Sequence, residues 1–259
     1  MKKIFKIFII LCMFIVLMCV VLYLNNNNNE NSDSNEEIEF IKRDNNDLDH
    51  AIKKREKFND KTYMRESENY KVGVVNTTWS EGSGTLIDKN HVLTASHVVS
   101  KPDGKVPDNF SIQYYPYGKN SKIISRQNKP IGIKNIKRIK NTEITILTLN
   151  KPITQINPAN LAKNELREGE QVKAVGYYNK DGNPSQQYTS YGNFAFERDD
   201  VDNTQQTLIM AHIKNHKGMS GGPLFNTNDE VVGITSFMYT KYNYSGFAGI
   251  KKLKDEIKN

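Results

Sequence analysis

The sequence has 259 residues, 37% of them hydrophobic, and a formal net charge of +7, which allows one large or two small domains. Its only cysteines, Cys12 and Cys19, lie in an apolar N-terminal stretch, so the rest of the chain has no disulfide, no cysteine metal site and no catalytic thiol. Its five histidines lack metal-ligand spacing such as HExxH, and we therefore expect no metal and no cofactor.

The N-terminus combines a positive charge with an apolar run. Lys2, Lys3 and Lys6 precede the charge-free stretch Ile7 to Leu24, whose 18 residues are at the lower limit of what spans a bilayer. No small-residue cleavage site follows the stretch. The lysines favour the inner side of the membrane, so the rest of the chain is expected outside. Residues 1–24 are predicted to be either an uncleaved membrane anchor or a cleaved signal peptide, and both predict export.

Residues 25–62 are predicted to be a polar disordered linker or a pro-segment. The part from Asn25 to Glu37 consists of Asn, Glu, Ser and Asp and has no apolar side chain to bury. The remainder has some helical character but many charges. Within it, residues 52–58 are interpreted either as a processing site or as a solvated helical turn.

Residues 63–259 are predicted to form the folded domain. From Tyr70 onward, short apolar or alternating runs rich in β-branched residues are separated by turn residues, as is typical of strands. The runs are residues 71–75, 82–88, 91–99, 110–115, 143–149, 171–178, 206–213, 230–237 and 246–250. No long helices alternate with them, so the pattern predicts an all-β barrel or sandwich, with two barrels favoured. Residues 251–259 have the composition of a short C-terminal helix.

The segment 119–140 contains eight Lys or Arg residues and no acidic one. It is interpreted either as solvated loops and strand edges or as a surface for an anionic polymer, a membrane or an acidic substrate. Neither interleaved aromatic residues nor a nucleic-acid motif accompanies the charges, so no nucleic-acid partner is expected.

A serine surrounded by glycines is the first candidate for chemistry. Gly218, Gly221 and Gly222 flank Ser220. Glycine costs backbone entropy wherever it occurs, so three within five residues indicate a special turn. The turn is either a plain loop between strands, or it holds a nucleophile whose backbone forms an anion-binding pocket.

Two further residues complete a set of catalytic roles. His97 follows a corner of small residues after an apolar strand, and Glu143 opens the apolar run 143–149. Alone, each has an ordinary structural interpretation, a structural histidine and a solvated edge carboxylate. With Ser220 they supply a nucleophile, a general base and a carboxylate that orients the base and stabilises its cation.

The local sequences resemble the chymotrypsin-like superfamily and, within it, the bacterial glutamyl endopeptidase and exfoliative toxin family. The resemblance lies in "GSGTLI…LTASHVV", "EITILTL", "GMSGGPLFN…EVVGI" and "GFAGI", and extends from Tyr70 to the C-terminus. It implies two six-stranded antiparallel β-barrels with the active site between them. It also implies a serine endopeptidase, exported from a bacterial cell, that acts as a monomer on protein or peptide substrates. The backbone N–H groups of Gly218 and Ser220 are expected to form its oxyanion hole.

The sequence departs from this family at three positions. Glu143 stands where the family has aspartate, although related viral proteases use glutamate in that role. In the specificity pocket, Asn215 and Thr235 replace a threonine and a histidine, so neither position carries a cation. A neutral substrate residue is therefore at least as well supported as glutamate.

Two other functions remain open at this point. One is a protease-fold binding protein or pseudoenzyme that has lost activity through Glu143 or a malformed pocket. The other is a membrane-anchored quality-control protease of the HtrA type, which shares "GSG" and "HVV" with this chain. That group carries a C-terminal peptide-binding domain, which the sequence does not suggest.

Overall fold

The structure is a computed structural model that describes residues 62–100, 111–118, 129–178, 186–198, 206–239, 243–251 and 253. All of them belong to one unit of the chain, Phe58–Asn259. The predicted membrane segment, linker and processing site in residues 1–61 lie outside the described residues. Among the helices in the described ranges, none has the length and hydropathy needed to cross a membrane.

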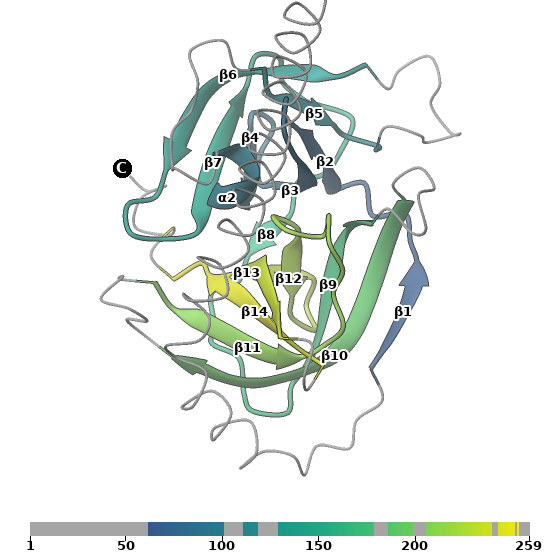
Figure 1. Cartoon of the computed structure of the whole chain (residues 1–259), viewed down its shortest axis with the longest axis vertical. Helices are drawn as coiled ribbons and strands as arrows, with labels where there is room; N and C mark the ends of the chain where they lie inside the picture. Colours follow the sequence, from purple (N-terminus) through teal and green to yellow (C-terminus); the bar gives the residue numbers. More distant parts are fainter. Residues whose placement is uncertain are drawn as a thin grey trace, which may run out of the picture. The chain divides into compact units, whose positions relative to one another are not determined.

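The first half of the domain is a closed barrel (Figure 1). Its strands are β2 (Val72–Asn76), β3 (Glu81–Leu86), β4 (His91–Ala95), β5 (Gln113–Tyr115), β6 (Ile131–Arg138) and β7 (Ile144–Leu149). They are joined antiparallel in the order β2-β3-β4-β7-β6-β5, and the pairing of β2 with β5 closes the ring. A short helix, α2 (Ser96–Val99), follows β4 directly.

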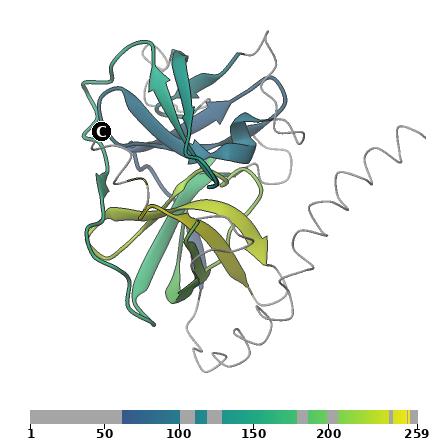
Figure 2. The same ribbon diagram turned by 90° about the vertical axis from the view of Figure 1, so that its left-hand side faces the viewer.

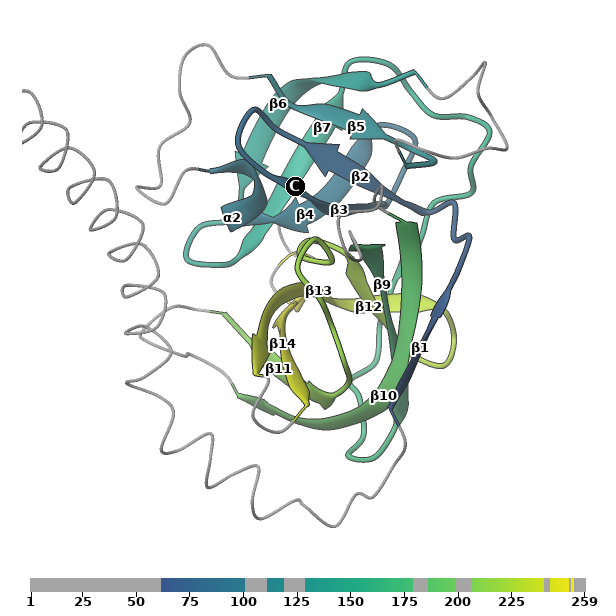
Figure 3. The same ribbon diagram turned by 45° about the vertical axis from the view of Figure 1, so that its right-hand side comes forward.

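The second half also contains a closed ring of six antiparallel strands. The ring is formed by β9 (Gln171–Tyr178), β10 (Gln186–Arg198), β11 (Leu208–His212), β14 (Tyr244–Gly249), β13 (Glu230–Tyr239) and β12 (Pro223–Phe225). It closes because β9 pairs with both β10 and β12. Two edge strands join it: β1 (Tyr63–Glu66) pairs with β10, and β8 (Asn160–Leu161) pairs with β13. Figures 2 and 3 show the first barrel in blue to teal and the second in green to yellow.

Apolar side chains fill both barrels. In the first, Leu86, Leu93 and Leu147 are fully buried, and in the second Leu224 and Phe247 are. Burying a side chain of this size contributes about 1.5–3 kcal/mol of transfer free energy, so these residues supply the driving force that closes each ring. The predicted all-β class and the two six-stranded antiparallel barrels are confirmed.

Each of the nine predicted runs contains a strand, but the details differ in two ways. Residues 96–99 form helix α2 instead of continuing β4. Strands β1, β6, β8, β10 and β12 were not predicted. Strand β6 lies in the basic segment 119–140 and carries exposed Lys134 and Lys137, which interrupt an apolar pattern. The predicted C-terminal helix lies mostly outside the described residues, although Leu253 is described and fully buried.

Candidate active site

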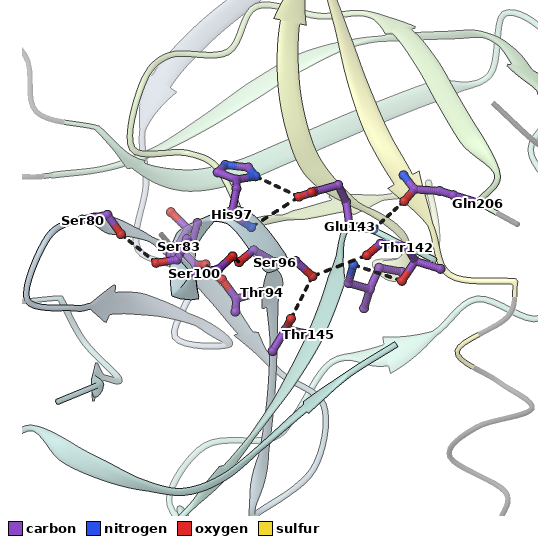
Figure 4. Close-up of polar contacts among 12 residues, drawn as sticks. Ser80, Ser83, Thr94, Ser96, His97, Ser100, Thr142, Glu143, Thr145 and Gln206 are labelled. Atoms are coloured by element: carbon purple, nitrogen blue, oxygen red, sulfur yellow. Dashed lines mark hydrogen bonds and ion pairs between the residues drawn. The ribbon is translucent and has the colours of Figure 1, made fainter. Parts of the chain in front are cut away.

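The strand pairing of the first barrel brings His97 and Glu143 together. Strands β4 and β7 are antiparallel, with Ala95 opposite Ile144, so the residues just beyond these ends are neighbours. The Nδ1 atom of His97 lies 2.9 Å from Oε2 of Glu143, and the two side chains point toward one another (Figure 4). This distance is that of a hydrogen bond between the imidazole and the carboxylate.

Backbone and side-chain hydrogen bonds of neighbouring residues hold this pair in place. The Ser96 N–H donates to the Glu143 carbonyl oxygen at 3.0 Å, and the Glu143 N–H donates to the side-chain oxygen of Gln206. The hydroxyl groups of Ser96 and Thr145 are 2.9 Å apart, which links α2 to β7 a second time. The positions of the histidine and of the carboxylate are thus set by backbone and side-chain hydrogen bonds of the residues next to them.

The electrostatic environment keeps Glu143 charged. Burial acts to raise the pKa of Glu143, but the hydrogen bond from His97 and the charges of His97 and Arg138 outweigh this effect, so the pKa lies below its ordinary value. Glu143 is therefore ionised at neutral pH and accepts a hydrogen bond from Nδ1–H of His97. The side chains of His97 and Glu143 are 45% and 39% exposed, so water and substrate can reach the pair.

The segment around Ser220 has a backbone that only glycine adopts easily. Gly218 has φ of +97° and Gly221 has φ of +82°. A Cβ atom on Gly221 would lie 2.2 Å from the Ser83 carbonyl oxygen, and one on Gly218 would lie 2.8 Å from the Tyr177 carbonyl oxygen. Positive φ and the close approach of other backbone together account for these glycines.

Three consecutive carbonyl groups of this segment are hydrogen-bonded. The Gly218 carbonyl accepts from the Ser83 hydroxyl at 2.9 Å, and the Ser220 carbonyl accepts from the Ser83 N–H at 2.7 Å. The Met219 carbonyl accepts from the Gly222 N–H at 3.0 Å. Within the described ranges, neither the Gly218 N–H nor the Ser220 N–H donates to a backbone carbonyl. Both amides are therefore available to a negatively charged oxygen.

The serine segment and helix α2 meet at Gly82. A Cβ atom on Gly82 would lie 2.7 Å from the Val98 side chain and 3.0 Å from the Ser220 carbonyl oxygen. No hydrogen bond joins His97 to Ser220 among the residues that the structure describes. The structure thus pairs His97 with Glu143 and holds Ser220 near the helix that carries His97.

The two predicted specificity residues are buried beside the same segment. The Thr235 N–H donates to the Gly222 carbonyl and the Thr235 carbonyl accepts from the Gly221 N–H, which fixes Thr235 next to the serine turn. Asn215 and Thr235 are only 6% and 2% exposed. The side-chain Oδ1 and Nδ2 of Asn215 and Oγ1 of Thr235 have no hydrogen-bond partner in the part of the chain that is described.

Two contributing residues were missed by the sequence interpretation. Ser83 stands in the quoted "GSGT" motif, but nothing in that motif indicates that its side chain reaches Gly218. Gln206 lies far from Glu143 in the chain, and no local pattern relates the two. In the described ranges no group of three or more His, Cys, Asp or Glu side chains is arranged to hold a metal. The expected absence of a metal and of a cofactor stays a prediction.

Two antiparallel six-stranded barrels, with a histidine–carboxylate pair on one and a glycine-wrapped serine on the other, define the class of chymotrypsin-like peptidases. The model of the trypsin-like peptidase domain matches residues 82–234, more than half of the chain, so the protein belongs to this family. A comparison with curated proteins gives no significant match.

Solved structures show the same fold. One is a Glu endopeptidase in complex with MPD, with a TM-score of 0.62 and 16% identity over 74% of this chain and 93% of that chain. Another is the protease Rv3671c from M. tuberculosis in its active form, with a TM-score of 0.54 and 16% identity over 72% of this chain and 79% of that chain. Its inactive Ser343Ala mutant gives the same TM-score and identity over 73% and 85%.

Proposed function

We propose that this peptidase is a serine endopeptidase that hydrolyses peptide bonds through an acyl-enzyme on Ser220, with His97 as general base and Glu143 as the orienting carboxylate. One observation carries the proposal. The His97–Glu143 hydrogen bond of 2.9 Å lies beside a turn whose Gly218 and Ser220 amides donate to no backbone carbonyl in the described ranges. This arrangement supplies a base, its orienting group and an anion-binding pocket around one hydroxyl.

The reaction has two halves. Ser220 Oγ attacks the substrate carbonyl carbon while Nε2 of His97 takes the hydroxyl proton, and the carbonyl electron pair moves onto oxygen, where the Gly218 and Ser220 amides stabilise it. The C–N bond then breaks, and His97 gives the proton to the leaving amine. Water enters and repeats the sequence, which releases the carboxylic acid and restores Ser220. Glu143 holds the Nδ1–H throughout and stabilises the imidazolium.

Glutamate performs the role that aspartate has in this family. Its longer side chain reaches Nδ1 at 2.9 Å, within the range of a good hydrogen bond. Its lowered pKa keeps it anionic, as the stabilisation of an imidazolium requires. This geometry favours an active enzyme over a pseudoenzyme impaired by Glu143.

Asn215 and Thr235 support a preference for a neutral carboxamide at the residue before the cleaved bond. The Asn215 side chain offers both a donor and an acceptor, and the Thr235 hydroxyl offers either. Once substrate binding exposes these buried atoms, a glutamine side chain can pair with them, because it both donates and accepts. A glutamate carboxylate only accepts, which leaves the acceptor Asn215 Oδ1 without a donor, and neither position offers a cation to balance the negative charge.

Matched peptides test this preference. Two substrates that differ only in glutamine or glutamate before the cleaved bond should differ in kcat/KM by at least about 10-fold in favour of glutamine, because unpaired buried polar groups discriminate strongly. Asn215→Ala should reduce that ratio. A higher kcat/KM for the glutamate peptide would refute the preference and leave the catalytic proposal intact.

The sequence before the domain supports export, with the catalytic domain outside the cell. The domain is then held at the membrane if residues 1–24 are retained, or secreted if they are cleaved. Fractionation of producing cells, with N-terminal sequencing of the mature protein, distinguishes these two forms. Sedimentation of the purified domain tests the proposed monomer.

Purified Ser220→Ala tests the catalytic proposal. Proteolysis should fall by several orders of magnitude, because covalent catalysis is lost while the fold and the binding surfaces remain. Near wild-type proteolysis in this variant would exclude Ser220 as the nucleophile. A wild type that binds peptides without cleaving them would favour the binding-protein alternative.

A further inference from the structure

Ser83 is a fully buried residue of β3 that makes four hydrogen bonds. Its carbonyl accepts from the Thr94 hydroxyl at 2.8 Å, and its side-chain oxygen accepts from the Tyr177 N–H at 2.8 Å. Its hydroxyl donates to the Gly218 carbonyl at 2.9 Å, and its N–H donates to the Ser220 carbonyl at 2.7 Å. One residue of the first barrel therefore contacts both ends of the segment 218–220, which belongs to the second barrel.

The direction of the hydroxyl proton follows from its two partners. The Tyr177 N–H can only donate, so the Ser83 oxygen accepts from it, and the hydroxyl proton is left to point at the Gly218 carbonyl. The hydroxyl is thus held in one orientation.

These hydrogen bonds restrain the orientation of the N–H groups in the segment 218–220. A peptide unit is planar, so a carbonyl that is hydrogen-bonded restrains the rotation of the amide joined to it. Ser83 holds the carbonyls of Gly218 and Ser220, and Gly222 holds the carbonyl of Met219, whose peptide unit carries the Ser220 N–H. Rotation of the Ser220 N–H out of the pocket would therefore break the hydrogen bond of the Met219 carbonyl. The Gly218 N–H belongs to the peptide unit of the Lys217 carbonyl, and Ser83 restrains it through the other peptide unit of Gly218, whose carbonyl oxygen it holds.

We propose that the side chain of Ser83 is a positioning residue that holds the oxyanion hole in its active conformation. It acts through Gly218 and does not contact the substrate. Because β3 forms a hairpin with β4, and β4 leads directly into the helix that carries His97, the same strand also sets the turn relative to the general base. The proposal rests on the proposed function of Ser220.

The oxyanion exists only in the transition states and intermediates. Loss of the Ser83 hydroxyl should therefore lower the rate of the chemical step and leave ground-state binding nearly unchanged. Removal of a whole oxyanion-hole donor lowers kcat by about 10²–10³-fold, so displacement of one should lower it by about 10–100-fold. A purely structural role would lower the melting temperature and the fraction of active protein, without a change in rate per folded molecule.

Diisopropyl fluorophosphate is a suitable probe, because its reaction with a serine also develops charge on an oxygen and needs no knowledge of the natural substrate. The maximal inactivation rate and the half-saturating concentration are measured for wild type, Ser83→Ala and Thr85→Val. Thr85 is the matched control: it lies on the same strand, is fully buried, and donates its hydroxyl to a backbone carbonyl, that of Lys71. The folded fraction of each variant is measured by circular dichroism, and the labelled fraction is measured by intact mass, so that rates refer to folded protein.

Ser83→Ala should reduce the maximal inactivation rate about 10–100-fold with a nearly unchanged half-saturating concentration, and Thr85→Val should stay within about 2-fold of wild type. Equal rates in the two variants would overturn the proposal while wild-type labelling at Ser220 still supports the proposed function. A wild type that does not react at Ser220 would overturn both.

Ser83→Cys keeps the test valid if Ser83→Ala does not fold. It retains the shape of the side chain but has only a weak S–H donor, so an intermediate loss of rate is expected. A wild-type rate in Ser83→Cys would contradict the proposal.

Discussion

At the scale of single residues, Glu143 is the position where this chain differs most from the family it resembles. Its backbone is fixed by Ser96 and Gln206, and its carboxylate reaches Nδ1 of His97. An additional methylene group adds a rotatable bond, which the contact with the His97 ring constrains.

Replacement of Glu143 tests its role directly. Glu143→Gln should lower turnover by about 10³–10⁴-fold, because the neutral amide neither fixes the required tautomer nor stabilises the imidazolium. Glu143→Asp should retain substantial activity. The matched control is Asp88→Asn, since Asp88 also forms a carboxylate–histidine pair, with His91 at 2.7 Å, in the β3–β4 turn. Turnover is measured by steady-state kinetics for all three variants. Equal turnover in Glu143→Gln, Glu143→Asp and Asp88→Asn would exclude the proposed role of Glu143.

The lowered pKa of Glu143 predicts how stability varies with pH. A carboxyl group with a lower pKa in the folded state contributes stability above its unfolded pKa, and this contribution is lost as the pH falls through the folded pKa. The unfolding free energies of wild type and Glu143→Gln should therefore differ most above about pH 5 and converge below about pH 4. Denaturant titrations across this range measure the difference, and a gap that widens toward low pH would be contrary to expectation.

At the scale of elements, the turn 218–222 depends on glycine for its shape. Gly221→Ala should lower both stability and activity, since positive φ costs about 1–2 kcal/mol for a residue with a Cβ and the Ser83 carbonyl would also have to move. Gly132→Ala on β6 is the control, because its Cβ would meet the flexible Asn150 amide. Thermal unfolding and turnover measure both effects, and equal values for the two variants would contradict this reading of the turn.

The sequence predicts those elements whose pattern is local. Strand β9 was predicted with its observed ends, because an apolar run between turn residues determines it. The sequence does not predict strand β6, because its exposed lysines interrupt the alternation of apolar and polar residues. Strand β10 is polar at its start and bends at an irregularity between Phe194 and Phe196, which weakens any period-2 pattern.

In the candidate site, too, only the residues that stand in local motifs are predicted by the sequence. Ser220, His97 and Glu143 stand in motifs that can be read locally. The supporting bonds from Ser83 and Gln206 join residues far apart in the chain, so only the folded structure reveals them. The resemblance to a known family named the catalytic roles, while the fully hydrogen-bonded carbonyls of the serine turn depend on how the two barrels meet.

At the scale of the whole molecule, a buried glutamine links the barrels. Gln187 of β10 is 8% exposed and binds the chain that leads from β1 to β2. Its Oε1 accepts from the Ser67 hydroxyl at 3.1 Å and from the Asn69 N–H, and its Nε2 donates to the carbonyls of Asn69 and Val72 at 3.0 and 3.1 Å. The segment that leads from β1 to β2 is therefore held by the Gln187 side-chain amide, whose oxygen and nitrogen are both hydrogen-bonded.

Gln187→Leu should lower the unfolding free energy by about 2–3 kcal/mol, because it leaves buried polar groups of the connection without partners. Gln186→Leu, on the adjacent exposed residue of the same strand, should change it by less than about 0.5 kcal/mol. Urea unfolding of both variants provides the comparison, and equal stabilities would show that Gln187 does not hold the barrels together.

The central claim, that Ser220 is an activated nucleophile, is tested most directly by mass spectrometry of the protein treated with diisopropyl fluorophosphate. Wild type should gain one diisopropylphosphoryl adduct with loss of fluoride, located on Ser220 in the peptide that contains residues 218–222, and the reaction should be much slower in Glu143→Gln. Ser220→Ala should gain none. A wild type that remains unmodified, or an adduct on another serine that persists in Ser220→Ala, would contradict the account.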